Sequence, residues 1–443
     1  MKTLKKNIIP ILFVSSIMAI NAILWISKMN AAFLNEKSIL TSVLGSTLLM
    51  GFFLVFLLST KAKWIEKLFG GLDGVYFWHR LLAMGTTALI FLHGITSISN
   101  LSSISNNFLL FGNAGEAGEL ARNGFLFLVI FALLAKFFKY EHFRFIHRFL
   151  VIPYMIALYH GFFSSWVNLF SFDTLSIWML LTSSIGLASA LYMLFVFQRS
   201  AFRYKGQIEE KVELNATTLE LKVKMDKHYH FKPGQFAFIK IKMNDFDQEP
   251  HPFSISGQEG NYIYFTIKSL GDFTESLKKN LITPAEIHIT QAYGHMTNTL
   301  STKKQVWIAG GIGISPFLGR LRSSEEFTSD THLYYSVNYE SEAVHLDRLR
   351  QLSNQKENFR FTLFEASKQG FLSIKNLEID DDCIVSMCGP RPMVMALKKQ
   401  IHSKYPKVKI EYEAFSFTGT LVEDIIKKYK TIKKRLKTRK LTS

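Results

Sequence analysis

Apolar residues are gathered in the first 200 positions of the chain, where they form six long runs. Each run is near the ~20 residues that a helix needs to cross a bilayer. A removable signal peptide is the alternative for the first run, but that run is long and no small-residue cleavage site follows it, which favours a retained helix. The pattern predicts membrane-spanning helices over residues 7–27, 38–60, 76–98, 123–139, 146–166 and 174–197.

Beyond Lys205 the pattern changes to short alternating segments such as ELKVKM, FAFIKIKM and YIYFTIKSL. A period of two between turn residues predicts a small antiparallel β-barrel. From about residue 303, apolar strands alternate with helices, which predicts parallel strands in an α/β nucleotide-binding domain. The predicted parts are a membrane domain (1–200), a barrel (205–298), an α/β domain (300–417) and a basic tail (418–443).

Positive charge indicates on which side of the membrane each loop lies. Lys and Arg gather before the first run, after the second, between the fourth and fifth and after the sixth, whereas segments 99–121 and 167–172 carry none. Since positive loops stay inside, both termini and the soluble half are expected in the cytoplasm of a plasma-membrane protein. The tail is expected either to lie on the inner leaflet as a basic amphipathic helix or to be disordered and solvated.

Composition narrows the partners. The formal charge of +17 is compatible with nucleic-acid binding, but much of the excess sits in inner loops and the tail. Anionic lipid is therefore the better counterion, and neither nucleic acid nor an obligate protein partner is expected. Cys383 and Cys388 are the only cysteines, too few for a disulfide framework or an iron–sulfur cluster.

Four histidines stand near the ends of two predicted helices: His79 and His93 in the third run, His147 and His160 in the fifth. Both helices run from inside to outside by the charge rule, so His79 meets His147 at an inner level and His93 meets His160 at an outer level. The two levels are about 20 Å apart. Polar groups within a membrane usually have a partner or a task, and two imidazoles at each level suit a haem with no open coordination position.

Helix geometry complicates this interpretation. Thirteen residues at about 100° each leave His160 roughly 140° away from the face of His147. Pro153 lies between them, so we expect a distortion of the helix there. The alternative is that the histidines bond backbone carbonyls between helices. Four histidines in matched pairs favour haem, as does the arginine that follows each inner histidine, Arg80 and Arg148, which could pair with propionates.

Three stretches of the soluble half carry candidate chemistry. HPFSIS (251–256) offers an aromatic ring flanked by polar donors, and GDFTESL (271–277) places glycine and threonine at a helix start, where free N–H groups attract phosphate. AGGIGISPF (309–317) is a glycine turn between strand and helix. This turn lacks the third glycine and the later acidic residue of the dinucleotide fingerprint, so a plain Rossmann dehydrogenase is a poor match.

Taken together, these motifs resemble those of the ferric reductase and NADPH oxidase superfamily of membrane flavocytochromes, with a ferredoxin reductase-type flavoprotein module. The likeness covers about residues 40–417, and its most specific elements are the histidine spacings, HPFSIS, GDFTESL, GGIGISP and MCGPRPM. It implies a six-helix haem-binding bundle that carries a cytoplasmic barrel for FAD and an α/β domain for NAD(P)H. The implied cofactors are FAD and two b-type haems, with His79, His93, His147 and His160 as the iron ligands.

The resemblance also implies roles for individual residues of the soluble half. The flavin and its ribityl chain would be held by His251, Pro252, Phe253, Ser254 and Ser256. The FAD phosphates would be held by Lys268, Gly271 and Thr274. The pyridine nucleotide would be held by Gly310, Gly311 and Gly313, with Gly389 and Pro390 beside the nicotinamide. Cys388 at the nicotinamide and Phe415 over the flavin ring would be the catalytic pair, with Phe417 as the alternative cover.

The expected function is electron transfer across the membrane, from cytoplasmic NAD(P)H through FAD and two haems to an extracellular acceptor. That acceptor is either a ferric chelate or dioxygen. A flavin is required because a hydride carries two electrons, whereas haem iron accepts one at a time. The alternative is a haem-free, membrane-anchored flavoprotein that donates electrons to a cytoplasmic partner protein.

The residue after the strand YYSV predicts the choice of nucleotide. Asn338 stands where NADPH-using relatives often have a basic residue. A 2′-phosphate is best bound by a charged, bidentate donor such as arginine, whereas asparagine offers neutral hydrogen bonds. We therefore expect little discrimination against NADH in kcat/KM. A preference for NADPH above about 100-fold, worth ~2.7 kcal/mol, would contradict this assignment.

Overall fold

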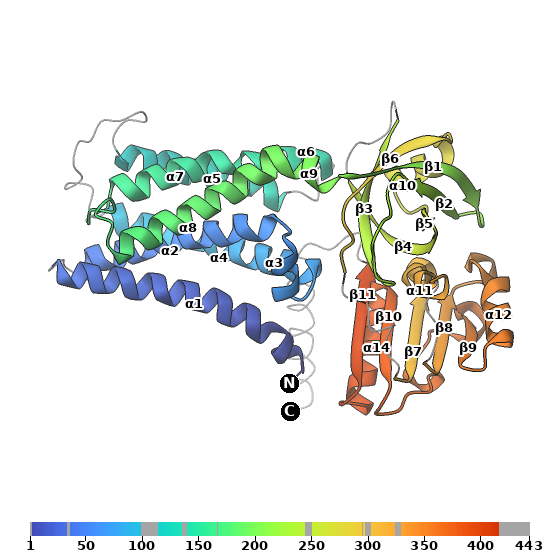
Figure 1. Ribbon diagram of the computed structural model, residues 1–443. Coiled ribbons are helices and arrows are strands. Elements are labelled where there is room, and N and C mark those ends of the chain that lie inside the picture. Colours follow the sequence, from blue (N-terminus) through green and yellow to red (C-terminus); the bar gives the residue numbers. More distant parts are fainter. Residues whose placement is uncertain are drawn as a thin grey trace, which may run out of the picture. The chain divides into compact units, whose positions relative to one another are not determined.

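The computed structural model describes residues 2–32, 36–98, 114–134, 140–165, 167–243, 250–294, 296, 303–323 and 329–415. The chain divides into two compact units, Met1–Arg199 and Ser200–Ser443 (Figure 1). The tail 418–443 and Phe417, on which two expectations rest, lie outside the described residues.

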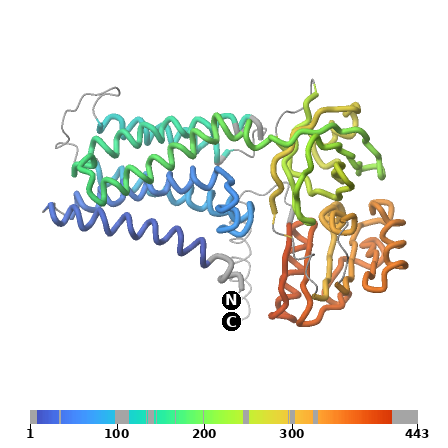
Figure 2. The backbone as a smooth tube through the Cα atoms, in the orientation of Figure 1, coloured from blue at the N-terminus to red at the C-terminus, as the bar shows by residue number. Residues whose placement is uncertain are grey.

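The first unit is built from helices (Figures 1 and 2). Within the described ranges, five helical segments are long and apolar enough to cross a membrane. The central one is α2, which packs against α1, α4, α7 and α8. The helices are α1 (Lys2–Ala31), α2 (Glu36–Ser59), α3 (Lys63–Leu68), α4 (Leu72–Ile98), α5 (Ala114–Leu133), α6 (Tyr140–His147), α7 (Val151–Phe163), α8 (Thr174–Leu191) and α9 (Phe197–Ala201).

Helix α2 occupies the centre because it is apolar on all sides, as expected for a helix with neighbours on every face. It also approaches α4 closely, since a Cβ on Gly51 would collide with the Thr86 side chain. Small residues permit such backbone approaches in membrane domains. On its other side, Asn21 of α1 donates to the Ser46 hydroxyl at 2.9 Å.

The predicted fourth run, 123–139, begins too late. Helix α5 starts at Ala114, nine residues earlier. Its first turns carry Glu116, Glu119 and Arg122, and these charged residues conceal the helix from a search for apolar residues. The same charges keep α5 out of the set of apolar spans, so five spans are found rather than the six expected.

The predicted fifth run is broken into three pieces. Helix α6 ends at His147, a 3₁₀ turn follows over Arg148–Leu150, and α7 begins at Val151. The expected distortion is therefore present, but it precedes Pro153 instead of centring on it. Pro153 lies in the first turn of α7, where its missing N–H has no helical partner to lose.

The second unit begins with the predicted antiparallel barrel, which is confirmed (Figure 1). It closes in the order β1-β2-β5-β4-β3-β6 around alternating apolar side chains such as Leu221, Ile263 and Phe265. The strands are β1 (Tyr204–Glu213), β2 (Thr218–Met225), β3 (Phe236–Lys242), β4 (His251–Glu259), β5 (Tyr262–Lys268) and β6 (Ala285–Ile289). Helix α10 (Asp272–Asn280) follows β5.

The parallel α/β domain is also confirmed. Its five strands pair in parallel in the order β11-β10-β7-β8-β9. Because β8 and β10 lie on opposite sides of β7, the strand order reverses at the carboxyl end of β7, where open α/β sheets bind ligands. The strands are β7 (Gln305–Gly310), β8 (Thr331–Val337), β9 (Phe359–Glu365), β10 (Ile384–Pro390) and β11 (Lys409–Phe415), and the helices are α11 (Ser315–Leu321), α12 (Leu346–Gln355), α13 (Ala366–Gln369) and α14 (Arg391–Lys404).

The barrel and the α/β domain meet where α11 packs against β4. Gly319 makes this approach possible, because a Cβ at that position would lie 2.6 Å from the backbone oxygen of Ile255. Ser315, at the start of α11, donates to the carbonyl of Thr266 on β5 at 3.1 Å. The glycine turn that precedes α11 is thereby held against the barrel.

This close approach predicts that Gly319→Ala destabilises the second unit by about 1–3 kcal/mol, since an added methyl group in a tightly packed contact forces the backbone to shift. A thermal melt followed by the fluorescence of Trp307, the one tryptophan after residue 200, measures the change. Gly271→Ala is the matched control, because nothing lies within 4 Å of a Cβ there and its φ of −176° is extended. Equal melting temperatures for the two variants would contradict the prediction.

Candidate functional site

The four membrane histidines form two pairs. The ring centroids of His79 on α4 and His147 at the end of α6 are 6.3 Å apart, with planes at 64°. Those of His93 on α4 and His160 on α7 are 6.2 Å apart, with planes at 66°. At each of the two levels, one ring from α4 thus faces one ring from the α6–α7 segment.

The 3₁₀ turn helps both pairs to form. A 3₁₀ helix advances about 120° per residue and an α-helix about 100°, so three residues add about 60° of rotation. The mismatch between His147 and His160 falls from roughly 140° to about 80°. The 3₁₀ turn therefore accounts for part of the rotation that brings His147 and His160 into their pairs.

Backbone carbonyls orient two of the four rings. The Nδ1 of His79 lies 3.0 Å from the oxygen of Val55, and the Nδ1 of His160 lies 2.6 Å from the oxygen of Ala114. A carbonyl can only accept a hydrogen bond, so Nδ1 carries the proton in both rings and Nε2 keeps its lone pair. This arrangement is typical of histidines that bind a metal through Nε2.

The spacing of the rings fits a shared metal. An imidazole–metal bond is about 2 Å long, so two imidazoles on opposite sides of one metal place their centroids roughly 6 Å apart. Both pairs have this separation. A direct hydrogen bond between two rings would bring the nitrogens to within ~3 Å and the centroids closer than observed.

Two glycines that the sequence analysis missed lie against the outer pair. A Cβ on Gly45 of α2 would be 2.8 Å from Cε1 of His93, and a Cβ on Gly118 of α5 would be 2.7 Å from Nδ1 of His160. Each glycine leaves room for an imidazole ring. A glycine in an apolar helix, at the level of a histidine in a neighbouring helix, would have been the signal.

The proposed flavin residues lie along β4 of the barrel. His251 stacks on Phe273 of α10, with centroids 3.7 Å apart, and Phe253 lies 6.2 Å from the same ring. Ser254 pairs with Phe236 of β3 in the antiparallel ladder. Pro252 is exposed, whereas Ser256 is fully buried with its hydroxyl 2.9 Å from that of Thr266. Ser256 therefore stabilises the barrel rather than facing outward with His251.

The three residues proposed for the FAD phosphates have partners within the protein. Thr274 caps α10, since its Oγ1 accepts from the N–H groups of Leu270 and Gly271 at 2.9 and 3.1 Å. Lys268, at the end of β5, forms an ion pair with Glu342 of the α/β domain at 3.5 Å. The helix start carries Asp272 and Glu275, so the site offers backbone N–H groups together with two carboxylates.

The glycine turn after β7 lies against the carboxyl end of β10. A Cβ on Gly313 would collide with the carbonyl of Cys388, and one on Gly310 would lie 2.5 Å from Cε of Met393. Gly311 and Gly389 hold positive φ values of 53° and 156°. These glycines let two strand ends meet where the strand order reverses.

The remaining candidate residues converge at this strand edge. Cys388 pairs with Glu413 of β11, and Pro390 pairs with Phe415. Glu413, two residues before Phe415 and not among the predicted site residues, approaches the barrel: a Cβ on Gly294 would lie 3.0 Å from its Oε1. The fold therefore brings the β10–β11 edge close to the barrel segment that follows β6.

The chain matches three protein families in order. Residues 44–158 match a ferric reductase like transmembrane component, 207–311 an FAD-binding domain and 307–399 an oxidoreductase NAD-binding domain. In this order of domains the chain is similar to the ferric reductase and NADPH oxidase superfamily. The matched families are those of a membrane component followed by FAD-binding and NAD-binding oxidoreductase domains.

The chain has curated relatives of two kinds, electron transfer components or subunits and respiratory burst oxidase homologues. It is 29% identical over 186 residues to the anthranilate 1,2-dioxygenase electron transfer component of Acinetobacter baylyi, which covers 39% of this chain and 54% of that protein. It is 27% identical over 169 residues to respiratory burst oxidase homolog protein F of Arabidopsis thaliana, which covers 38% of this chain and 17% of that protein. The chain thus spans about half the length of the first relative and less of the second.

Among solved structures, the FAD/NAD binding domain of nitric oxide dioxygenase from Vibrio cholerae is similar over 48% of this chain and 98% of that one. The sequence identity is 18% and the TM-score is 0.42.

Both cysteines are buried, and burial raises the pKa of the Cys388 thiol well above its ordinary value, with the Glu413 carboxylate acting in the same direction. Burial also raises the pKa of Cys383. A thiol with a raised pKa stays protonated and unreactive, because a tenfold weaker acid holds about a tenth as much thiolate.

We expect both cysteines of the native protein to react with iodoacetamide at pH 8 at least about tenfold more slowly than glutathione. Mass spectrometry measures the adducts, with the unfolded protein as control. Rapid alkylation of native Cys388 would contradict the assigned burial.

Proposed function

We propose that this protein transfers electrons across the plasma membrane, from cytoplasmic NAD(P)H to an acceptor outside, with FAD and two b-type haems as its cofactors. The observation that carries the proposal is the presence of two imidazole pairs, each with ring centroids 6.2–6.3 Å apart, in a membrane domain of ferric reductase type. The distribution of Lys and Arg supports a cytoplasmic position for both termini and for the soluble unit.

In this proposal His79 with His147 and His93 with His160 would hold the inner and outer haems through Nε2. FAD, when bound, would supply the conversion of a two-electron hydride into single electrons, and the haems would supply one-electron transfer. The carbonyls of Val55 and Ala114 would keep two of the rings in the tautomer that leaves Nε2 free.

The soluble unit would bind both nucleotides. The β4 segment that begins at His251 would face the flavin, and Gly271 with Thr274 would lie near its phosphates. The turn Gly310–Gly313 would hold the pyridine nucleotide where the strand order reverses, as in other open α/β sheets. Cys388, kept protonated by burial, would contact the nicotinamide as a neutral thiol, and Phe415 would cover the flavin.

A second candidate function has its own support. One relative, which matches this chain over 186 residues, is named as an electron transfer component of a dioxygenase. A membrane-anchored flavoprotein without haem, which passes electrons to a cytoplasmic protein, would use the same FAD and NAD(P)H sites. The visible spectrum of the purified protein decides between the two functions, since a b-type Soret band is expected only from the first.

The acceptor is a separate question, with ferric chelates and dioxygen as the two candidates. Anaerobic reduction of the purified protein with NADH, followed by mixing with ferric citrate or with oxygenated buffer, compares them directly. The acceptor that restores the oxidised spectrum faster, at matched concentration, is the better substrate.

We predict that the full-length protein binds two b-type haems and that His160→Ala retains one. The removed imidazole leaves the outer site with a single ligand, so outward transfer stops while flavin reduction by NADH continues. A pyridine haemochrome assay counts the haems. His142→Ala is the matched control, because His142 is exposed on α6 and should leave two. Two haems in His160→Ala would overturn the assignment.

A glycine substitution tests the same site while both imidazoles are kept. Gly118→Ala adds a methyl group 2.7 Å from the His160 ring, whereas nothing lies within 4 Å of a Cβ on Gly85. We expect Gly118→Ala to weaken or abolish outer haem binding and Gly85→Ala to leave it unchanged. The haem-to-protein ratio measures the effect, and equal ratios would count against haem at this pair.

A further inference from the structure

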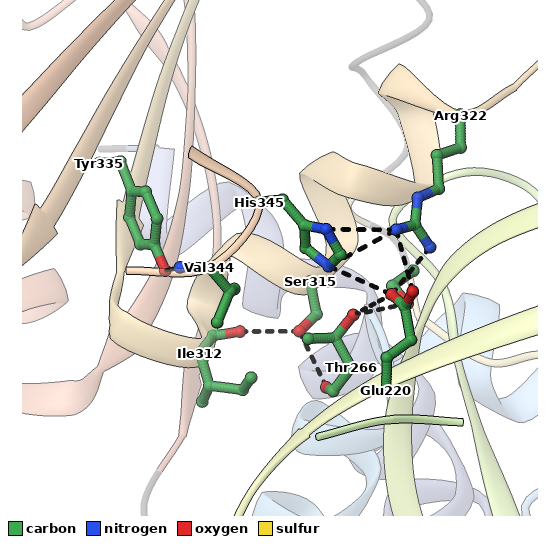
Figure 3. A network of polar contacts seen from close by, with 9 residues as sticks. Glu220, Thr266, Ile312, Ser315, Arg322, Tyr335, Val344 and His345 are labelled. Atoms are coloured by element: carbon green, nitrogen blue, oxygen red, sulfur yellow. Dashed lines mark hydrogen bonds and ion pairs between the residues drawn. The ribbon is translucent and has the colours of Figure 1, made fainter. Parts of the chain in front are cut away.

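A buried carboxylate joins the barrel to the α/β domain. Glu220 lies on β2, and its two oxygens accept from both terminal nitrogens of Arg322, at 2.8 and 3.1 Å. Arg322 directly follows α11. The Nε2 of His345, the residue before α12, lies 3.2 Å from Oε2 of the same carboxylate (Figure 3). One barrel residue therefore binds two points of the other domain.

The three side chains are almost completely removed from solvent. The exposed fractions are 5% for Arg322 and 12% each for Glu220 and His345. Burial acts to raise the pKa of Glu220, but hydrogen bonds from His345 and Arg322 more than offset it and hold the pKa at about 2. Glu220 is therefore a carboxylate at any physiological pH. A buried charge of this kind makes its partners obligatory, because removal of one leaves the other unpaired.

The surrounding contacts give the network one geometry. The guanidinium of Arg322 stacks over the Tyr264 ring at 4.9 Å, and its stem packs so closely on β4 that a Cβ at Gly257 would lie 2.5 Å from it. His345 holds a φ of +57°, a left-handed conformation that is unusual for histidine. The strain persists because the contact with Glu220 is made from that conformation.

The network also reaches the glycine turn. The Thr266 hydroxyl lies 3.0 Å from Oε2 of Glu220, and the Thr266 carbonyl accepts from Ser315 at 3.1 Å (Figure 3). Ser315 in turn lies 2.9 Å from the oxygen of Ile312, inside the turn. An unbroken series of polar contacts thus runs from the barrel charge to the proposed nucleotide cradle.

We propose that Glu220, Arg322 and His345 are positioning residues that hold the glycine turn of the α/β domain in register with the flavin-binding barrel for hydride transfer. This proposal rests on the proposed function of the soluble unit. In this step NAD(P)H would give up a hydride, a proton with two electrons, to the flavin; the nucleotide would become NAD(P)⁺ and the flavin would be reduced. Transfer between two bound rings depends steeply on alignment, and a misplacement of about 1 Å can cost roughly 100-fold in rate. A bidentate arginine–carboxylate pair fixes both distance and angle.

The test uses the full-length, FAD-loaded protein in lipid nanodiscs, with anaerobic stopped-flow measurement of flavin reduction by NADH. For Glu220→Gln we expect the saturating rate per bound FAD to fall between about tenfold and hundredfold. The deuterium isotope effect with 4-deuterated NADH should rise, because a misaligned hydride step becomes more rate-limiting. FAD content should stay near one per chain, since Glu220 lies outside the proposed flavin contacts.

Two further variants separate geometry from charge and from strain. Arg322→Lys keeps the positive charge but loses the bidentate fork, so an intermediate rate is expected. His345→Asn loses the ring contact, and asparagine accepts the left-handed backbone more readily. Its rate should fall by less than that of Glu220→Gln. Arg322→Lys decides the question if Glu220→Gln fails to fold.

The matched control is Glu210→Gln, which breaks the Lys222–Glu210 pair at 2.7 Å within the barrel; the side chains of that pair are 28% and 53% exposed. It should leave the rate within twofold of wild type. An unchanged saturating rate and isotope effect in Glu220→Gln, or a loss of FAD and thermal stability with an unchanged rate per bound FAD, would overturn the proposal. Absence of NADH-dependent flavin reduction in the wild-type protein would instead overturn the proposed function.

Discussion

An imidazole among apolar helices has two nitrogens that need partners, and the membrane unit is organised around four such rings. Backbone carbonyls of Val55 and Ala114 bind the Nδ1 side of two rings, which leaves their Nε2 atoms free. The other features of the unit follow from the same requirement. Gly45 and Gly118 make room for the outer rings, and the 3₁₀ turn at Arg148–Leu150 rotates the two ends of one segment toward each other.

The second unit has a different structural requirement, because its barrel and its α/β domain must meet at a defined angle. Apolar packing between α11 and β4 brings them together, and Gly319 sets how closely. Packing of that kind is non-directional, whereas the fork of Arg322 on Glu220 has a direction. Buried ion pairs contribute little net stability. The buried Glu220–Arg322 pair is therefore better explained as a contact that orients the two domains than as one that stabilises them.

Each unit carries the features of a different part of the proposed electron path. The strand-order reversal beside β7 and the convergence of Cys388, Glu413 and Gly294 place nucleotide chemistry in the soluble unit. The paired imidazoles lie in the membrane unit, where the proposal places single-electron transfer. Relatives of the chain include both a dioxygenase component and a respiratory burst oxidase homologue, so these similarities alone do not distinguish the two functions. The histidine pairs support the first of the two functions, because the haem-free alternative gives them no role.

Patterns in the sequence were enough to predict the apolar helices of the first unit, the barrel, the parallel sheet and the two histidine levels. These depend on local periodicity and on spacing along single helices, which sequence records directly. It did not locate the start of α5, whose charged first turns conceal the helix, or the turn before Pro153. It also missed Gly45, Gly118 and the Glu220–Arg322–His345 network. Those features join residues up to 125 positions apart in the chain, through packing between elements whose relative placement has no local signature. Only the tertiary structure brings them together.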